Sequence, residues 1–456
     1  MNRHVLIGHF GPSDRPRFTP GAEEVATRID LLNGHDSLDH GIGRALGDLS
    51  RLGVRPSELG IDVLILAALV HAADTRISRG IDAQDGWTRE IRLLVPVSDP
   101  DRWRAAAPVF TRMLNFLTGD RWKLTFRARP RRNRTLAPPS PTPLLTAPFD
   151  HLALFSGGLD SLIAAIDCLQ EGKTPLLISH AGEGATSDAQ NTVFDAMKSA
   201  YASRRFERLR LWMNFPDGLV NETSSEDTTR GRSFLFFSLG VFAGTGLSQP
   251  FTLNVPENGL IAVNVPLDPL RLGALSTRTT HPFYIARWNE ALSALGMSGR
   301  IVNPYWNKTK GEMTAECRHS SLLKKLVASS LSCASPTKGR WQGHGTQHCG
   351  YCVPCIIRRA ALFRGLGPDN DPTTYTLADL TASSLNTEQS EGVQIRSFQL
   401  AVERIRARPD LAWLLIHKPG PLFDETVQAQ AELAEVYRRG LDEVGALLAG
   451  VRTAPV

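Results

Sequence analysis

Apolar residues in the first part of the chain recur at two different spacings. Intervals of three and four positions predict helices over residues 37–51, 58–73 and 101–117. Alternation of apolar and polar residues predicts strands over residues 90–97 and 122–129. We therefore expect an N-terminal α/β domain at residues 1–130.

The pattern changes after residue 148, where short apolar runs alternate with helical stretches. Strands are expected at residues 150–155, 174–180, 208–214, 251–255 and 300–303. Helices are expected at residues 159–171, 187–203 and 232–245. Such alternation is typical of a parallel sheet with crossover helices, so the fold class is α/β. This domain spans residues 148–365, and a helical region follows at 366–456.

A Pro- and Arg-rich stretch at residues 131–147 separates these parts of the chain. Proline cannot donate to a sheet ladder, and closely spaced prolines favour a stiff, extended backbone. The arginines at positions 127–134 are more typical of a solvated linker than of a binding patch. We expect a domain boundary here.

Composition and charge narrow the class of protein. The 456 residues are 42% hydrophobic and 21% charged, as in ordinary globular proteins. A net charge of +5 is too small to argue for a nucleic-acid partner. Apolar runs fall well short of the roughly 20 residues of a membrane span, and the start lacks a signal-peptide pattern. The chain is expected to be cytoplasmic, with no membrane or nucleic-acid partner.

A phosphate-binding loop is the first candidate site. One predicted strand runs directly into Ser156-Gly157-Gly158-Leu159-Asp160-Ser161, inside which a helix begins. Glycines let the backbone approach a phosphate, and the N–H groups of a helix start point at the anion. The two serines add donors, and Asp160 either holds Mg²⁺ or caps the helix. A plain Gly-rich strand-to-helix turn is the alternative.

Four cysteines form the second candidate site. Cys333, Cys349, Cys352 and Cys355 lie close together, whereas the first 167 residues contain none. In a cytosolic protein this spacing favours a metal over disulfides, and four thiolates complete the shell of a structural Zn²⁺. An iron–sulfur cluster and reduced core thiols are the alternatives. His344 and His348 are weaker ligand candidates, and Cys168 and Cys317 are expected in the core.

The loop resembles the PP-loop of the ATP pyrophosphatase superfamily. Together with the later Cys-x15-Cys-Gly-Tyr-Cys-x2-Cys pattern, it makes residues 148–365 similar to the 7-cyano-7-deazaguanine synthase (QueC) family. The resemblance implies an adenine nucleotide alpha hydrolase-like core, ATP and Mg²⁺ at the loop, and Zn²⁺ at the cysteines. It further implies that ATP adenylates a 7-deazaguanine-type carboxylate, which a nitrogen nucleophile then attacks.

The chain also departs from a plain member of that family. It carries residues 1–147 and 366–456 in addition, and Glu257-Asn258 and the segment at 275–282 replace an aspartate-tyrosine substrate motif. In this form it is similar to the QueC-like proteins of bacterial anti-phage operons, of the QatC type. That likeness implies protein partners from a defence operon and an acyl acceptor such as a protein amine.

Further residues are candidates for the substrate and the leaving group. Arg278 and His281 suit a carboxylate or a purine-like edge, or belong to a polar loop capping the helix at Pro282. Glu257 and Asn258 follow a strand at its carboxyl end, where open sheets bind ligands, or form a β-turn. Arg232 and Lys310 complete the set of catalytic candidates. Each lies at a predicted helix start and is expected either to reach a phosphate or to be solvated.

Two other functions remain open. A PP-loop enzyme that modifies tRNA uses the same loop and would need reactive cysteines or a basic RNA-binding domain. A nucleotide-binding scaffold of a defence complex would keep the loop without turnover. The intact Ser-Gly-Gly-Leu-Asp-Ser sequence favours an enzyme.

Overall fold

The structure is a computed structural model. It describes residues 2–34, 37–83, 86–137, 149–182, 184–247, 250–267 and 278–455. Most of the expected linker, including its proline run, lies outside the described residues, as do positions 275–277 of the segment before His281.

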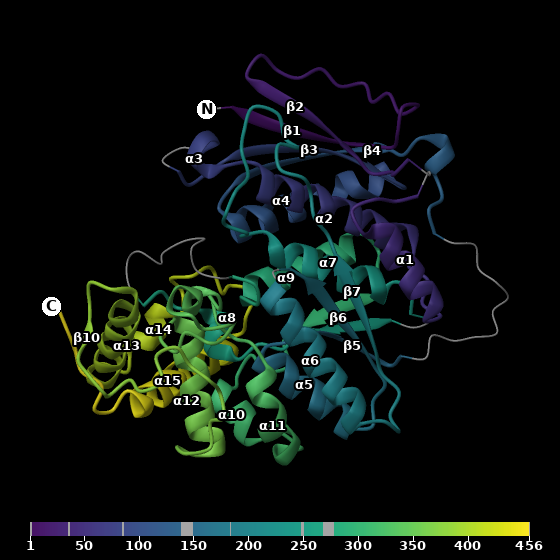
Figure 1. The fold of residues 1–456 in the computed structure, drawn as a ribbon. Coiled ribbons are helices and arrows are strands. Elements are labelled where there is room, and N and C mark those ends of the chain that lie inside the picture. Colours follow the sequence, from purple (N-terminus) through teal and green to yellow (C-terminus); the bar gives the residue numbers. More distant parts are fainter. Residues whose placement is uncertain are drawn as a thin grey trace.

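Two parallel sheets organise the fold (Figure 1). The first, in the order β2-β1-β3-β4, consists of Arg3–His9 (β1), Glu24–Asp30 (β2), Glu90–Val97 (β3) and Arg121–Ala128 (β4). The second, in the order β7-β6-β5-β8-β9, consists of His151–Leu154 (β5), Pro175–Ala181 (β6), Glu207–Trp212 (β7), Phe251–Asn254 (β8) and Gly299–Val302 (β9). The prediction of an α/β protein with a parallel sheet is confirmed.

The patterns in the sequence do not predict β1 and β2. The run Val5-Leu6-Ile7 of β1 is buried on both faces, so it lacks the alternation that marks a half-buried strand. The run is also short, and a short apolar run alone does not distinguish a strand from a helix.

Helices between and outside the sheets complete the layers. Those up to β9 are Ile42–Arg51 (α1), Glu58–Arg76 (α2), Arg79–Asp82 (α3), Pro100–Thr118 (α4), Leu159–Gln170 (α5), Gly184–Ala200 (α6), Arg232–Gly244 (α7), Gly259–Val263 (α8) and Pro282–Ala294 (α9). After β9 follow Lys310–Ala315 (α10), Ser320–Leu326 (α11), Val353–Leu366 (α12), Ser390–Ala407 (α13), Leu411–Leu415 (α14) and Val427–Leu447 (α15).

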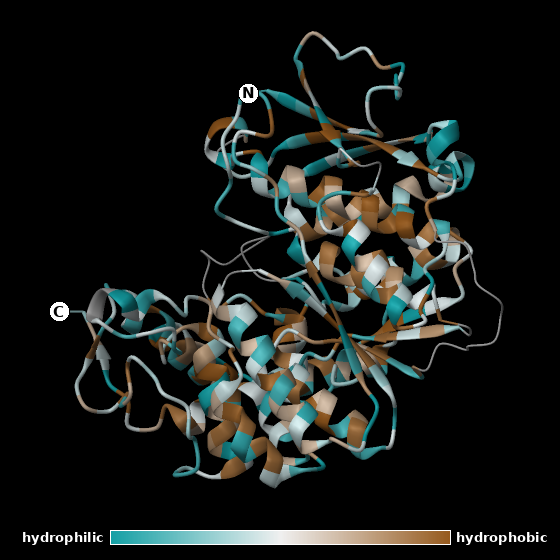
Figure 2. Cartoon of the chain, turned by 45° about the vertical axis from the view of Figure 1, so that its right-hand side comes forward, coloured by the Kyte–Doolittle hydropathy of each residue, from teal (hydrophilic) through white to brown (hydrophobic). Residues whose placement is uncertain are grey.

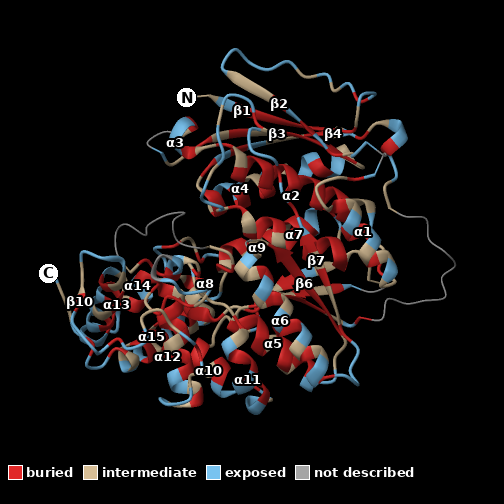
Figure 3. Cartoon of the chain, viewed as in Figure 1, coloured by how far each residue is buried: buried red, intermediate tan, exposed pale blue. Residues whose placement is uncertain are grey.

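One hydrophobic core joins the two sheets. Helices α2 and α4 lie under the first sheet and pack against α7 and α9, which cover one face of the second sheet (Figures 1 and 2). Burial extends around α2 and α7, as expected for helices enclosed between layers (Figure 3). The N-terminal block, residues 2–137, therefore packs directly on the domain that carries the phosphate-loop sequence.

The second sheet is buried on both faces. Leu152 and Leu154 of β5 face the shared core, whereas Ala153 and Phe155 face a second core with α5 and α6. This alternation follows the two-residue period of a strand. It fixes the end of β5, and hence the start of the loop, between two layers.

The C-terminal region packs as a helical unit around α12, α13 and α15. It also contains a two-stranded parallel pair, Leu385–Asn386 (β10) with Thr453–Ala454 (β11), which the expectation of a helical region does not include. In the described part of the chain, no helix is both long and apolar enough to cross a membrane.

Candidate functional site

The phosphate-loop sequence lies at the point where the order of the second sheet reverses. From β5 the chain proceeds to β6 and β7 on one side, whereas β8 and β9 lie on the other. Open α/β sheets bind ligands beyond the carboxyl ends of their strands at such a point. The loop leaves β5 there, and α5 begins at Leu159.

Gly157 gives the loop a shape that other residues would strain. Its φ is +81°, and an added Cβ would lie 3.0 Å from Cγ of Gln190. Gly158 is the N-cap of α5 and has no side chain to cap it, and in the first turn Leu159 N instead donates to Ser332 Oγ at 3.3 Å. Ser161 Oγ donates to Gly158 O at 3.0 Å and lies 3.3 Å from Ser156 Oγ. The loop thus presents glycine backbone and two hydroxyls.

Asp160 lies beneath the loop in a buried polar cluster. Its Oδ1 is 2.9 Å from Nζ of Lys310, and its Oδ2 accepts from N and Nδ2 of Asn258 at 3.0 and 2.8 Å. Glu257 also hydrogen-bonds to Asp160. The structure therefore brings together Asp160, Lys310, Asn258 and Glu257, four of the residues predicted for the site. These side chains contact one another, and Asp160 does not cap α5.

The protonation of this cluster follows from its charges. Although burial opposes ionisation, Lys310 and hydrogen bonds from Glu257 and Asn258 hold the pKa of Asp160 below its ordinary value. Burial and the neighbouring Asp160 carboxylate raise the pKa of Glu257 well above its ordinary value. Asp160 is thus the charged carboxylate, paired with Lys310, and Glu257 is the protonated one.

Lys310 is held in place by the C-terminal region. It is the first residue of α10, whose N-cap Thr309 forms a capping box with Glu312. Glu443 of α15 accepts from Thr309 Oγ1, and from Gly311 N at 3.1 Å. Burial raises the pKa of Glu443 to about 7. Helix α15 thereby positions the residue that neutralises Asp160.

A cavity of about 500 Å³ opens beside the loop. It is lined by Leu117, Ser156, His180, Thr186, Gln190, Thr228, Thr229, Arg230, Arg232, Ser233, Phe236, Arg278, Thr279 and Leu331. Three arginines and five threonine or serine side chains besides Ser156 thus face it, and none of these described lining residues is acidic. Such a lining suits a ligand that carries negative charge and many hydrogen-bond acceptors.

The predicted substrate residues divide between two places. Arg278 lines the cavity, together with Arg232 of the leaving-group prediction. Glu257 and Asn258 are not among its described lining residues. Asn258 instead caps α8, its side chain accepting from Ile261 N at 3.1 Å.

His281 has a different place from the one predicted for a substrate residue. It is the N-cap of α9, and its Nδ1 accepts from Phe283 N at 3.2 Å. The ring is 1% exposed, and burial together with nearby Arg278 lowers its pKa to about 3. With Pro282 at the first helical position, the sequence favours this start of a helix. The capping alternative is the one the structure shows.

The four predicted cysteines form a cluster that could hold a metal ion. Their sulfur atoms all lie within 4.8 Å of one another, with 3.9 Å between those of Cys333 and Cys352 and 3.8 Å between those of Cys349 and Cys355. Sulfur ligands about 2.3 Å from a tetrahedral Zn²⁺ lie about 3.8 Å apart. The donor set and its spacing fit a zinc ion, and no disulfide joins the cysteines.

The cysteine cluster is tied to the loop by the residues that precede Cys333. Leu331 N donates to Gly157 O at 2.9 Å, and Ser332 Oγ accepts from Leu159 N at 3.3 Å. Ser332 N in turn donates to Nε2 of His348 at 3.1 Å, so the weaker ligand candidate His348 is part of this link. A metal at the cysteines would therefore stabilise the loop as well as the knuckle.

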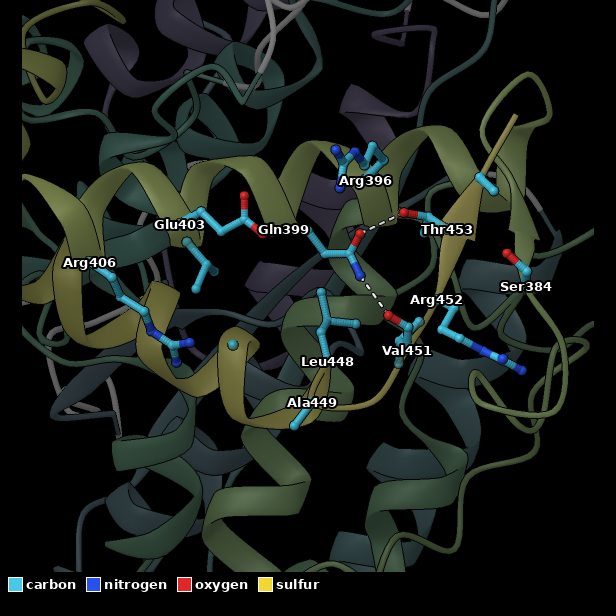
Figure 4. Close-up of a pocket in the computed structure, with 13 residues that line it drawn as sticks. Ser384, Arg396, Gln399, Glu403, Arg406, Leu448, Ala449, Val451, Arg452 and Thr453 are labelled. Carbon is cyan, nitrogen blue, oxygen red and sulfur yellow. Dashed lines mark hydrogen bonds between the residues drawn. The ribbon is translucent and has the colours of Figure 1, made fainter. Parts of the chain in front are cut away.

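A larger cavity of about 630 Å³ lies in the C-terminal region (Figure 4). Gln399 of α13 spans it, with Nε2 donating to Val451 O at 2.9 Å and Oε1 accepting from Thr453 Oγ1 at 2.7 Å. Its arginines, Arg396, Arg406 and Arg452, are exposed, and its described lining residues include none from the loop. We therefore place the candidate site at the smaller cavity beside Ser156.

Sequence patterns do not reveal several residues of the site. His180 is the next-to-last residue of β6 and lines the cavity. It is 4% exposed and has no hydrogen-bond partner at either ring nitrogen among the described residues. Gln190 lies against Gly157, and its Nε2 donates to His180 O at 3.2 Å. The position of His180 at the carboxyl end of a parallel strand is the one signal that could have indicated it.

Comparisons with known proteins add little to this description. No family model matches the chain, and no curated protein matches it. Among solved structures, the chain is similar to one described as "Adenylation, ketoreductase, and pseudo Asub multidomain structure of a keto acid-selecting NRPS module". The identity is 9% and the TM-score 0.23, over 90% of this chain and 42% of that chain. A likeness of this degree carries no argument about function.

Proposed function

We propose that the protein is an ATP-dependent enzyme of the PP-loop type that adenylates a carboxylate for attack by an amine. One observation carries the proposal. The Ser156–Ser161 loop leaves β5 where the strand order reverses, beside a cavity lined by three arginines. Glycine backbone, helix N–H groups and guanidinium groups together suit a nucleotide and its leaving pyrophosphate.

The proposed roles follow from position. Ser156, Gly157, Gly158, Leu159 and Ser161 hold the phosphates, and Arg232 stabilises the pyrophosphate as it leaves. Asp160 and Lys310 form an ion pair beneath the loop and stabilise it. Since both oxygens of Asp160 already have partners, Mg²⁺ would reach the loop together with the phosphates of ATP and would neutralise their charge.

The reaction is a transfer in two steps. An oxygen of the substrate carboxylate attacks the α-phosphorus of ATP, the bond to the β-phosphate breaks, and pyrophosphate leaves. The amine nitrogen then attacks the acyl carbon and expels AMP, losing a proton as the amide forms. The three arginines suit the negative charge of both the acid and the pyrophosphate.

The proposed substrate is a 7-deazaguanine-type acid, and the proposed setting is anti-phage defence with protein partners. Both rest on the family resemblance of the loop and the cysteines. In the same proposal the cysteine cluster binds Zn²⁺ structurally, since four thiolates leave no position for a substrate.

The tRNA-modifying alternative gains no support from the other two cysteines. Cys168 and Cys317 are buried, and burial raises the pKa of each thiol to about 12. A reactive cysteine requires the opposite shift.

Pyrophosphate release tests the proposal. The purified chain is mixed with ATP, Mg²⁺, an amine and a panel of acids that includes 7-carboxy-7-deazaguanine. We expect an acid-dependent release of pyrophosphate and AMP, abolished in Ser161→Ala. Stimulation by bulk tRNA and by no acid would instead support tRNA modification. Binding of ATP without turnover under every condition would support the scaffold.

A further inference from the structure

Two arginines of the cavity are held in the same way by the N-terminal block. The guanidinium of Arg230 stacks over the ring of Trp87, 4.4 Å from its centroid, and donates to Thr118 O at 3.3 Å. The guanidinium of Arg278 stacks over the ring of Phe116 at 4.5 Å and donates to Phe116 O at 2.6 Å. Each guanidinium thus contacts one aromatic ring and donates to one backbone carbonyl of the N-terminal block.

Both carbonyls belong to the end of α4. The last carbonyls of a helix have no partner within the helix, and they carry the negative end of its dipole. A guanidinium placed there is therefore held by charge as well as by hydrogen bonds. The end of α4 is itself fixed, because Asp120 just beyond it accepts from Arg89 N at 3.0 Å and pairs with buried Arg79.

The segment that carries Arg230 has a second anchor in the same block. Gly231 N donates to Oδ2 of Asp74 at 2.7 Å, and Arg79 N donates to Oε2 of Glu226 at 2.6 Å. These bonds hold both ends of residues 226–231 against α2 and α3. The direction of the chain into α7 is therefore set by the N-terminal block.

Neither guanidinium forms an ion pair with a described acidic side chain, although Asp120 and Asp74 act on Arg230 from a longer distance. Within the described residues, no carboxylate forms an ion pair with Arg230 or Arg278, and their Nε atoms are buried without a partner. Burial lowers the pKa of both side chains, and the pKa of Arg230, at about 10, leaves that side chain charged at neutral pH. Two positive charges without an ion-pair partner in one cavity favour an anionic ligand.

We propose that the N-terminal block is a wall of the ligand site, in which Trp87 and the end of α4 position Arg230 and Arg278 to bind one oxyanionic group. Within the proposed function, on which this inference rests, that group is either the pyrophosphate end of ATP or the carboxylate of the acid. Trp87 and Phe116 are positioning residues, and Arg230 is a specificity-determining residue.

Substitutions of Trp87 test the inference, because its ring is half-buried and lies outside the shared core. The variants are Trp87→Leu, which removes the aromatic face, and Trp87→Phe, which keeps it. Arg230→Gln removes the charge directly and keeps the test usable should Trp87→Leu fail to fold. A matched control is Phe18→Leu, since the ring of Phe18 stacks under Arg92 at 4.9 Å on the outer side of the first sheet.

Direct binding to the full-length protein is measured by calorimetry, with inorganic pyrophosphate and with a purine-type carboxylic acid as separate probes. We expect Trp87→Leu to weaken the binding of at least one probe by about three- to tenfold, and Trp87→Phe to stay within about twofold. Arg230→Gln should weaken the same probe at least as much, and Phe18→Leu should change neither. The probe affected identifies whether the group is a phosphate or a carboxylate.

Three outcomes would overturn the inference: no binding of either probe to the parent protein, unchanged affinity in both Trp87→Leu and Arg230→Gln, or an equal loss in Phe18→Leu. With an active acid, Trp87→Leu should raise KM for the affected ligand and leave kcat nearly unchanged. Since calorimetry needs no turnover, weakened binding without any ATP turnover would refute the proposed function alone. Turnover with unchanged affinities would refute this inference alone.

Discussion

Nζ of Lys310 lies 2.9 Å from Oδ1 of Asp160, and both side chains are buried. Asp160 is part of the phosphate-loop sequence, whereas Lys310 begins α10, a helix held by the C-terminal region. The loop therefore depends on an ion pair between segments far apart in the sequence.

Removal of Lys310 should destabilise the protein strongly. Lys310→Met leaves the Asp160 carboxylate buried without its charge partner, which typically costs about 3–5 kcal/mol. The free energy of unfolding in urea measures the loss. Lys308→Met is a matched control, because its ion pair with Glu316 is largely exposed and should matter by less than about 1 kcal/mol. Equal stability of the two variants would contradict the pairing.

Gly157 should be needed for both backbone shape and function. Gly157→Ala places a side chain at φ +81°, at a cost of about 1–2 kcal/mol, and its Cβ meets Gln190. Gly172 at the end of α5 has nearly the same φ, +79°, with its nearest neighbour 3.7 Å from an added Cβ. Gly172→Ala should lose similar stability and keep ATP turnover, whereas Gly157→Ala should lose turnover. Full turnover in Gly157→Ala would argue against the loop as the phosphate site.

Stability should depend on pH through Glu443. Its pKa is about 7 in the folded chain and near 4.5 when unfolded, so the folded state binds the extra proton between these values. The free energy of unfolding should therefore fall as pH rises from 4.5 to 7, by up to about 3 kcal/mol. Urea unfolding across this range should show a flatter profile for Glu443→Gln than for the parent protein. Parallel profiles would contradict the raised pKa.

The cysteine cluster should contain one Zn²⁺ per chain. Loss of a structural zinc removes a large part of the folding free energy in small zinc domains, so Cys355→Ser or a strong chelator should lower Tm. Because Leu331 and Ser332 contact the loop, ATP affinity should fall as well. Elemental analysis and thermal unfolding measure both effects. Iron with sulfide, or a folded protein without metal, would contradict the assignment.

The features predicted from the sequence are those that local residues determine. The Ser156–Ser161 loop follows a strand and opens a helix as its sequence suggests, and the cysteines converge because their spacing is that of a knuckle. Both patterns span few residues. Their chemistry can therefore be inferred without the rest of the fold.

The remaining features depend on contacts between distant segments. Nothing near Asp160 in the sequence indicates Lys310 as its partner, and nothing near Arg230 indicates Trp87. His281 shows the opposite case, since its place as the N-cap of α9 follows from the local sequence. The packing of the N-terminal block on α7 and α9, which forms the wall of the cavity, follows only from the tertiary structure.

The transfer of oxygen from the acid to AMP tests adenylation most directly. The protein is incubated with ATP, Mg²⁺, an amine and the active acid labelled with ¹⁸O in its carboxylate, and the AMP is examined by mass spectrometry. Because the carboxylate oxygen that attacks the α-phosphorus leaves with AMP, we expect one ¹⁸O atom in each AMP formed. None should form in Ser161→Ala. Unlabelled AMP, or ADP and phosphate in place of AMP and pyrophosphate, would contradict carboxylate adenylation.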